Sequence, residues 1–425
     1  MTAPTGHTAT AAPARAGAAA LLLLSFVAFA ALFAHMRFPV ADVLVYRAEG
    51  AAVWNGTDLY GFTVTEWELP ATYPPFAALL FVPVALVPLS FAKAAFVVGN
   101  VALLALLVAL SLRCATPRPV RLTHTLPVVL AVTAGALWLE PVFQTLVFGQ
   151  INLALACLVL WDLGRPDGAR AKGFALGVAA GVKLTPALFA VYLLLTGRVR
   201  AALTALAGFA VSVGVGALVL PGASAEFWTR RLFETGRVGK AWIVDNQSLQ
   251  GLVARLTHLP EPGPLWLLPA AVLAAAGLWL ARRVYVHHGR TGVADFWAVL
   301  VTALVSLLVS PISWSHHWVW CVPLLVGLAL AAPRWVTVTV AAVFTARTMW
   351  LVPKQGDLDL HLPWWHQPFA SPYPLLALAA LGAALLATAP PFRPRFRPRV
   401  FPRTGFRRAR GNPVDHRSRP PRESN

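Results

Sequence analysis

Acidic residues are scarce in this sequence, and so is charge of either sign. Only 17 of the 425 residues are Asp or Glu, charged residues make up 12% of the chain, and hydrophobic residues make up 58%. The mean hydropathy is +0.65. So little polar surface excludes a soluble globule of this size. Uncharged apolar runs long enough for a bilayer core recur along the chain, so the composition predicts an all-α, polytopic membrane protein.

Cysteines are also few: Cys114, Cys157 and Cys321 lie in or beside apolar runs without CxxC spacing. This pattern excludes a disulfide framework and a cysteine zinc site. The 35 Lys and Arg residues give a net charge of +18, which would suit a nucleic-acid partner. The positive residues lie, however, in short loops between apolar runs and in the C-terminal tail, where retention of cytoplasmic loops explains them better. We therefore expect membrane lipids, and no nucleic acid, as partners.

The apolar runs set the expected fold. They predict spanning helices near 16–36, 91–112, 124–140, 146–163, 200–220, 264–284, 294–310, 315–332, 335–351 and 372–389. Two further stretches fit a simple span poorly: 75–89 is short and bounded by proline, and 173–196 carries Lys183 and Pro186 at its middle. Broken or re-entrant helices are tolerated where they line an enclosed cavity, and we interpret both stretches in this way. A bundle of about 10–12 transmembrane helices is expected.

Basic residues mark one side of the membrane. They lie in the loops around 113–121, 165–172, 198–200, 282–290 and 334, and in the tail 393–410. All fall on one side if the 173–196 stretch enters and returns, and the positive-inside rule makes that side, with both termini, cytoplasmic. The outer side receives residues 37–74, 140–150, 221–263 and 353–371, which hold 12 of the 17 acidic residues. The polar chemistry is therefore expected on the outer face.

The expected organisation is one membrane domain with two tails. Residues 1–15 form a disordered cytoplasmic tail, residues 16–390 form the transmembrane domain, and residues 391–425 form a basic, disordered tail that lies on anionic lipids. Residues 28–30 resemble a signal-peptidase site. The apolar run around them is long and many spans follow it, so we expect an uncleaved first helix.

Asp42 is the first candidate for chemistry. Residues 42–54 fit an amphipathic helix at the membrane interface, on which Asp42, Tyr46 and Glu49 share one face. A carboxylate at the mouth of an apolar cavity suits a general base, because desolvation raises its basicity. The alternative is that Asp42 merely caps this helix. Asp58 is a rival base, although its Gly-Thr-Asp-Leu-Tyr context is typical of a turn.

Further candidate residues lie at the starts of apolar segments or inside them. Tyr73 precedes two prolines, which fix an extended backbone. Gln150 and Asn152 stand at the start of a span, where their amides could bind sugar hydroxyls or could simply cap the helix. Lys183 lies about 16 Å into its apolar stretch, at 1.5 Å per residue. A lysine at this depth is costly unless it faces a polar cavity or an anion.

The outer loops carry amides beside aromatic residues, a combination that suits sugar rings. Asn246, Gln247 and Arg255 lie in one loop, and the sequence Trp314-Ser-His316-His317 lies in another. Tryptophan at the membrane interface is also a common anchor, so the aromatic residues have an alternative explanation. Two adjacent histidines point to different faces of a helix, and HExxH spacing is absent, so we expect no metal site and no cofactor, although a metal requirement stays open.

Taken in this order, the pieces resemble glycosyltransferase family 87. The matching motifs are Asp42…Tyr46…Gly56-Thr-Asp58-Leu-Tyr60, Tyr73-Pro-Pro75, Gly149-Gln-Ile-Asn152, Lys183-Leu-Thr-Pro186, Asn246-Gln-Ser-Leu249…Arg255 and Ser310-Pro-Ile-Ser-Trp-Ser-His-His317. They cover residues 40–320. The resemblance implies a GT-C-like bundle whose outer loops form the active site. It also implies a polyprenyl-phosphate sugar donor, such as decaprenyl-phosphate-mannose, with its lipid in a groove between helices.

The resemblance further implies site roles and a reaction. Asp42 would correspond to the catalytic carboxylate of an inverting transfer, which converts a β-linked donor into an α-mannoside on a glycolipid or lipoglycan acceptor. Lys183, Arg255 and either His316 or His317 are candidates for the donor phosphate. The residues expected to contact substrate are Tyr46, Asp58, Tyr73, Gln150, Asn152, Lys183, Asn246, Gln247, Arg255, Trp314, His316 and His317.

Two other functions stay open at this stage. A GT-C enzyme could transfer another sugar, such as arabinofuranose. A lipid or sugar transporter or flippase would also use broken helices and a lysine at membrane depth. The sequence has no internal repeat and its polar motifs cluster on one face, which favours the transferase.

Overall fold

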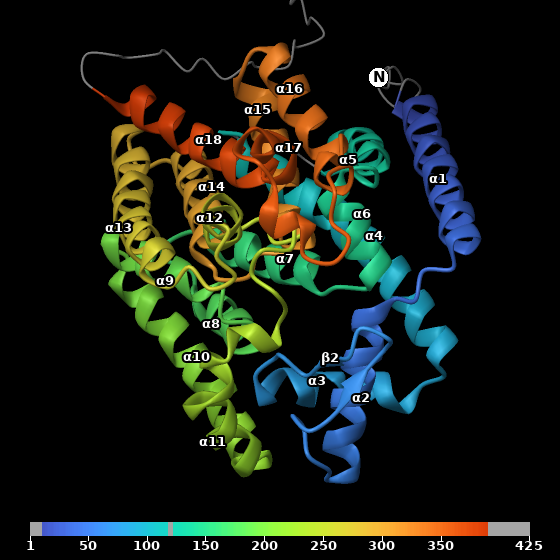
Figure 1. Ribbon diagram of the computed structural model, residues 1–425. Coiled ribbons are helices and arrows are strands. Elements are labelled where there is room, and N and C mark those ends of the chain that lie inside the picture. Colours follow the sequence, from blue (N-terminus) through green and yellow to red (C-terminus); the bar gives the residue numbers. More distant parts are fainter. Residues whose placement is uncertain (1–10, 118–121, 390–425) are drawn as a thin grey trace, which may run out of the picture.

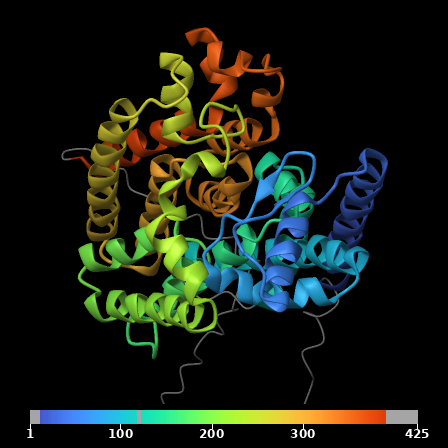
Figure 2. The ribbon, with the colours of Figure 1, turned by 60° about the horizontal axis from the view of Figure 1, so that its bottom comes forward.

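The computed structural model describes residues 11–117 and 122–389. Five helices are long and apolar enough to span a membrane: α1 (Ala11–Met36), α4 (Leu89–Ala115), α10 (Val199–Val219), α13 (Pro264–His287) and α14 (Gly292–Val309). In both views α1 stands at one edge of the bundle, and α10 and α13 lie at the opposite edge (Figures 1 and 2). The expectation of an all-α polytopic membrane protein is confirmed.

Shorter helices fill the rest of the described chain. They are α2 (Ala41–Asn55), α3 (Pro75–Leu86), α5 (Leu122–Ala136), α6 (Glu140–Phe148), α7 (Asn152–Leu163), α8 (Phe174–Val182), α9 (Ala187–Leu195), α11 (Pro221–Thr229), α12 (Leu249–Thr257), α15 (Cys321–Ala331), α16 (Arg334–Thr345), α17 (Gln367–Ala370) and α18 (Pro372–Thr388). The short 3₁₀ segments include η3 (Ser315–Trp320), which is kinked at Trp318. One antiparallel hairpin, β1 (Thr63–Val64) with β2 (Leu69–Pro70), completes the set.

Fewer straight spans form than the sequence predicts. Two bent helix pairs bring the number of candidate spans to at most seven among the described residues. One pair joins α5 to α6 at a bend of 79°. The expected span 124–140 therefore ends at Ala136, and the stretch 146–163 is divided between α6 and α7.

The segment 140–150 was expected as an outer loop, and this expectation is wrong. It forms helix α6, in which seven of the nine residues are buried. Pro141, in the first turn, suits a helix start because its missing N–H would have no intrahelical partner. Gly149 ends the helix with a left-handed φ of 72°, which glycine adopts without strain. Pro141 and Gly149 therefore mark the two ends of a short helix between the expected spans 124–140 and 146–163.

The broken helix at 173–196 is confirmed. Helix α8 ends at Val182, the backbone of Lys183 is extended (φ −149°, ψ 125°), and α9 begins after Pro186. Helix α8 packs backbone to backbone against α10: a Cβ on Gly177 would lie 1.9 Å from the carbonyl oxygen of Ala205. The break therefore exposes backbone and the Lys183 side chain inside the bundle.

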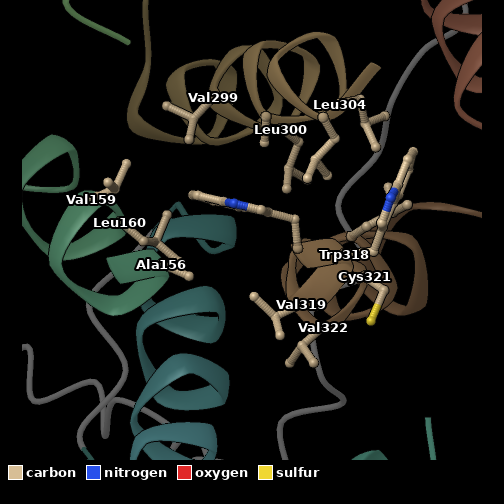
Figure 3. Close-up of a cluster of buried hydrophobic side chains, with 14 of the residues drawn as sticks. Ala156, Val159, Leu160, Val299, Leu300, Leu304, Trp318, Val319, Cys321 and Val322 are labelled. Atoms are coloured by element: carbon tan, nitrogen blue, oxygen red, sulfur yellow. The ribbon is translucent and has the colours of Figure 1, made fainter. Parts of the chain in front are cut away.

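The largest buried cluster extends over most of the bundle, from Phe29 of α1 to Leu381 of α18. Figure 3 shows a part of it in which α7, α14, η3 and α15 face one another, with Leu160 on α7, Leu304 on α14 and Trp318 on η3. Leucines on the outer faces of the long helices are exposed instead; Leu218 of α10, for example, is 85% exposed. An apolar exterior of this kind suits contact with lipid. The expected tail 391–425 and residues 1–10 of the expected N-terminal tail lie outside the described residues, and α1 begins at Ala11.

Candidate functional site

Helix α2 places Asp42 at the edge of the bundle interior. The N-cap of this helix is Val40, with a left-handed backbone and no side-chain capping bond, so the capping explanation for Asp42 is wrong. The face that carries Asp42, Tyr46 and Glu49 points inward: Tyr46 is fully buried and Glu49 is 1% exposed. Asp42 itself is partly exposed. Its carboxylate therefore sits where a buried polar network meets open space.

Two tyrosines and a glutamine form this network. The hydroxyl of Tyr46 lies 3.1 Å from Oε1 of Gln150, the hydroxyl of Tyr73 lies 3.2 Å from the same atom, and the two hydroxyls are 3.2 Å apart. Because hydroxyl donors occupy Oε1, the NH₂ end of the Gln150 side chain is free to donate elsewhere. It is the hydrogen-bond partner of the Asp42 carboxylate. Gln150 thus orients the carboxylate from a buried position.

Lys183 enters the same region from the break between α8 and α9. Its Nζ donates to Oδ1 of Asn152 at 3.1 Å and lies 2.9 Å from Nε2 of His317. The ring centroid of Tyr73 is 5.5 Å from Nζ. Asn152 in turn donates from Nδ2 to the carbonyl of His316 at 3.1 Å. Lysine, asparagine and the histidine pair therefore form one connected unit beside the Gln150 network.

The electrostatics around Asp42 suit a base. Burial is the main effect and raises the pKa of Asp42 to about 7. The hydrogen bond from Gln150 and the charge of Lys183 oppose this rise, and the charge of Asp245 adds to it. A carboxylate with a pKa near 7 accepts a proton at neutral pH more readily than an ordinary aspartate.

An apolar cavity begins at Lys183. Its volume is about 50 Å³, and it opens to the outside. Asn152, Lys183 and His317 form its polar end. The remaining wall is mainly apolar and includes Leu155, Ala156, Val159, Phe189, Val319 and Trp320. We call this cavity the Lys183 groove; it runs between α7, α9, α14 and η3.

Arg255, Asn246 and Gln247 do not face this groove. Arg255 is fully buried, and its guanidinium donates to the carbonyls of Trp242, Ile243 and Asn246 and to the Ser371 hydroxyl at 2.8–3.3 Å. No donor of Arg255 is left for a phosphate.

The two amides of this loop bind backbone. Oδ1 of Asn246 accepts from the N–H of Ser313 at 2.9 Å. Nε2 of Gln247 donates to the carbonyl of Ala370 at 2.8 Å. Both side chains therefore hold the 310–317 loop and the start of α18 in position.

Three other expected residues take different places. Asp58 is exposed, and its Oδ1 accepts from the N–H of Tyr60 at 2.9 Å, as in a turn. Trp314 packs against Gly239, where a Cβ would lie 2.7 Å from the indole. The ring of His316 is buried, 5.4 Å from the ring of Phe148 and 4.8 Å from that of His317.

Sequence reasoning missed one acidic residue of the site, Asp245, and gave a second, Glu49, no role. Asp245 accepts from the N–H of Ser315 at 3.1 Å and raises the pKa of Asp42 through its charge. Burial raises the pKa of Glu49 to about 8. Glu49 was recognised on the face of Asp42 without a role, and Asp245 directly precedes the Asn246 motif, which is the one signal that pointed to it. No group of three or more His, Cys, Asp or Glu that could hold a metal occurs among the described residues.

The fold and the site together define a multi-pass membrane protein with a basic carboxylate and a buried lysine at the end of an apolar groove. The sequence profile of glycosyltransferase family 87 matches residues 71–311. The chain belongs to this family, so the resemblance drawn from its motifs is confirmed. It is a glycosyltransferase, and the transporter alternative is set aside.

Curated relatives cover most of the chain. A Mycobacterium tuberculosis protein named polyprenol-phosphate-mannose-dependent alpha-(1-2)-phosphatidylinositol mannoside mannosyltransferase is 36% identical, over 85% of this chain and 87% of its own length. The Mycolicibacterium smegmatis protein of that name is 33% identical, over 80% and 82%. A Mycobacterium tuberculosis phosphatidylinositol pentamannoside mannosyltransferase with the same dependence and linkage is 34% identical, over 88% of each chain. No solved structure matches significantly.

Proposed function

We propose that the protein transfers mannose from a polyprenyl-phosphate-mannose donor to a hydroxyl of a phosphatidylinositol mannoside, forming an α-(1-2) linkage. The donor, acceptor and linkage are those in the names of its curated relatives. One observation carries the proposal for this chain. Asp42 and Lys183 interact electrostatically across one buried polar network, and the apolar Lys183 groove starts directly behind the lysine.

The donor phosphate binds at the polar end of the groove. Lys183 has three N–H donors, of which Asn152 and His317 engage two, so one remains for a phosphate oxygen. The polyprenyl chain lies along the apolar wall formed by residues such as Leu155 and Phe189. A charged headgroup anchored on lysine with its lipid in an apolar channel satisfies both halves of this substrate.

The sugar then lies between the Lys183 ammonium and the Asp42 carboxylate. Asp42 accepts the proton of the acceptor hydroxyl as the hydroxyl oxygen attacks the anomeric carbon. The bond between that carbon and the phosphate oxygen breaks, and polyprenyl phosphate leaves with the bonding electrons. Lys183 stabilises the negative charge that develops on the phosphate. A single displacement of this kind inverts the anomeric configuration.

The remaining candidates hold this geometry. Tyr46 and Tyr73 fix Gln150, which orients Asp42. Arg255 and Asn246 act as positioning residues for the loop that carries His317, because their polar atoms are engaged with protein. His317 completes the phosphate end of the groove.

We place the active site on the extracytoplasmic side, with both termini in the cytoplasm. The support is the distribution of charge along the sequence, from which the positive-inside rule predicts the basic loops on the side opposite the segments that carry Asp42 and Asp245.

The proposal is tested by mannose transfer in proteoliposomes that contain radiolabelled polyprenyl-phosphate-mannose and purified phosphatidylinositol mannosides. We expect Asp42→Asn to lose at least about 100-fold in rate, the usual contribution of a general base, while still binding donor. Asp357→Asn is the matched control, because Asp357 is 57% exposed and pairs with Lys240. Undiminished transfer by Asp42→Asn, or loss in Asp58→Asn instead, would remove Asp42 from the mechanism. No transfer by the wild-type protein would refute this choice of substrates.

A further inference from the structure

A second cavity lies at the other ends of the two helices that line the Lys183 groove. The groove is lined by Asn152 of α7 and Ser306 of α14, whereas the second cavity is lined by Leu163 and Asp295, near the opposite ends of the same helices. Its volume is about 280 Å³, and it opens to the outside. In the cluster of Figure 3, Ala156 and Val159 line the Lys183 groove, and Leu160 and Val299 line the second cavity. We call the second cavity the arginine cavity. The ends of α4, α7, α13 and α14 form its walls.

The carboxylates on the wall of this cavity are already neutralised. Asp295 accepts two bonds from the Arg198 guanidinium, at 2.7 and 2.9 Å. Asp167 pairs with Lys172 at 2.8 Å. Opposite charges this close largely cancel, so neither carboxylate repels an incoming anion strongly.

Three arginines line the wall, and two of them, Arg113 and Arg290, have no such partner among the described residues. The third, Arg165, bonds to Asp162 at 3.2 Å and to the carbonyl of Arg170 at 2.5 Å. Arg113, at the end of α4, and Arg290, in the turn before α14, line the same cavity and have no hydrogen bond or ion pair from their side chains within the described part of the chain. Both are exposed. Two guanidinium groups without an ionic partner in residues 11–117 and 122–389 therefore border one cavity, one from the end of α4 and one from the turn before α14.

The cavity also contains the start of a long helix. Helix α14 has 18 residues, and its first residue, Gly292, and its N-cap, Thr291, both line the cavity. The N-terminus of a helix carries a partial positive charge that favours anions. The wall also has an apolar part, which includes Leu160, Phe296 and Val299. This combination of two guanidinium groups, a helix start and an apolar wall suits a phosphate attached to an apolar body.

We propose that the arginine cavity binds a phosphate group between Arg113 and Arg290, carried by an anionic lipid or by a soluble phosphate compound. Guanidinium groups bind phosphate oxygens through pairs of parallel hydrogen bonds, which a lysine cannot reproduce. Retention of positive loops on one side of the membrane requires basic residues on that side but does not require two of them to converge on one cavity. A bound phosphate would explain why Arg113 and Arg290 border the same cavity.

Lipid binding to the purified full-length protein tests the proposal. The protein is placed in nanodiscs of phosphatidylcholine with a minor fraction of phosphatidylglycerol, and bound lipid is counted by native mass spectrometry. We expect the double variant Arg113→Gln/Arg290→Gln to bind phosphatidylglycerol about tenfold more weakly, because two charge-assisted contacts are lost. Arg170→Gln/Arg334→Gln removes the same charge outside the cavity and should bind as the wild type does. Equal binding by all three proteins, or equal loss in both variants, would overturn the proposal.

Inorganic phosphate distinguishes the two sources. If millimolar phosphate displaces the lipid, the site takes free phosphate compounds. If the lipid stays bound in the presence of phosphate, the site takes a lipid headgroup.

A second measurement uses the wild-type chain and does not depend on how the variants fold. Cys114 lines the cavity, while Cys157 and Cys321 are buried and serve as internal controls. We expect phosphatidylglycerol or phosphate to slow alkylation of Cys114, relative to phosphatidylcholine with chloride at equal ionic strength. Identical alkylation rates would contradict the proposal.

Discussion

Nζ of Lys183 lies 2.9 Å from Nε2 of His317, which joins the break in the 173–196 stretch to the 310–317 loop. A lysine ammonium only donates, so Nε2 of His317 accepts, and the proton of this neutral imidazole is on Nδ1. The pair holds a cation at the polar end of the Lys183 groove. This contact therefore links the Lys183 motif and the 310–317 motif to the proposed donor phosphate.

Replacement of Lys183 tests that link. Lys183→Met keeps the length of the side chain and removes the charge. We expect the KM for polyprenyl-phosphate-mannose to rise about 10- to 100-fold, since a charged hydrogen bond contributes about 1.5–3 kcal/mol. Steady-state kinetics at fixed acceptor measure it. An unchanged KM for the donor would place the phosphate elsewhere.

The pH dependence of transfer tests the base. Burial raises the pKa of Asp42 to about 7, so below that pH the carboxylate is protonated and cannot accept the acceptor proton. We expect kcat/KM to fall about tenfold per pH unit on the acid side of pH 7.

A neighbouring carboxylate should move this acid limb. The charge of Asp245 raises the pKa of Asp42, so Asp245→Asn should lower that pKa and shift the limb to lower pH. An asparagine can still accept the hydrogen bond from Ser315. Asp357→Asn, at an exposed carboxylate, should leave the limb where it is. If the acid side of the pH profile is the same in Asp245→Asn as in the wild type, the charge of Asp245 does not affect the pKa of Asp42.

The contact between α6 and α2 should control the position of Asp42. A Cβ on Gly149 would lie 2.4 Å from Cγ2 of Val43, and the φ of 72° is unfavourable for alanine by about 1 kcal/mol. We expect Gly149→Ala to push α2 outward and to lower kcat at least about tenfold, because a misplaced catalytic group loses its alignment. Gly99→Ala has no atom within 4 Å of its new Cβ and should be active. Full activity of Gly149→Ala would show that α2 tolerates displacement.

Arg255 should act on stability rather than on donor binding. Its buried guanidinium binds three carbonyls and one hydroxyl, so Arg255→Met leaves several of these acceptors unpaired. We expect a loss of about 1–3 kcal/mol in the free energy of unfolding for each buried acceptor left unpaired, seen as a lower Tm in detergent. The folded fraction should retain its KM for the donor. A raised KM with an unchanged Tm would instead support direct contact with the phosphate.

The sequence predicted those features that have a local cause. The break at Lys183 and Pro186 is confirmed because proline cannot continue a helix and a lysine at that depth requires a polar surrounding. The helix expected at 42–54 is confirmed as α2, and the spacing of Asp42, Tyr46 and Glu49 correctly placed them on one face. The family was recognisable because its motifs occur in a fixed order.

Other features depend on packing between distant segments. The segment 140–150 forms a buried helix because tertiary contacts, including those of Glu140 with Tyr373 and Trp350, bury it. Neither its length nor its composition separates this helix from a loop. The role of Arg255 depends likewise on carbonyls that the fold brings to it, and the effect of Asp245 on Asp42 joins residues about 200 positions apart. Periodicity along the chain contains no information on such pairs.

The configuration of the product tests the single displacement most directly. A β-linked polyprenyl-phosphate-mannose donor, a phosphatidylinositol mannoside acceptor and the purified protein are incubated, and the new linkage is examined by NMR of the anomeric carbon and proton. With Asp42 as a base that activates the acceptor, the account predicts an α-linked mannose from the β-linked donor. A β-linked product would require a glycosyl-enzyme intermediate and would contradict the account.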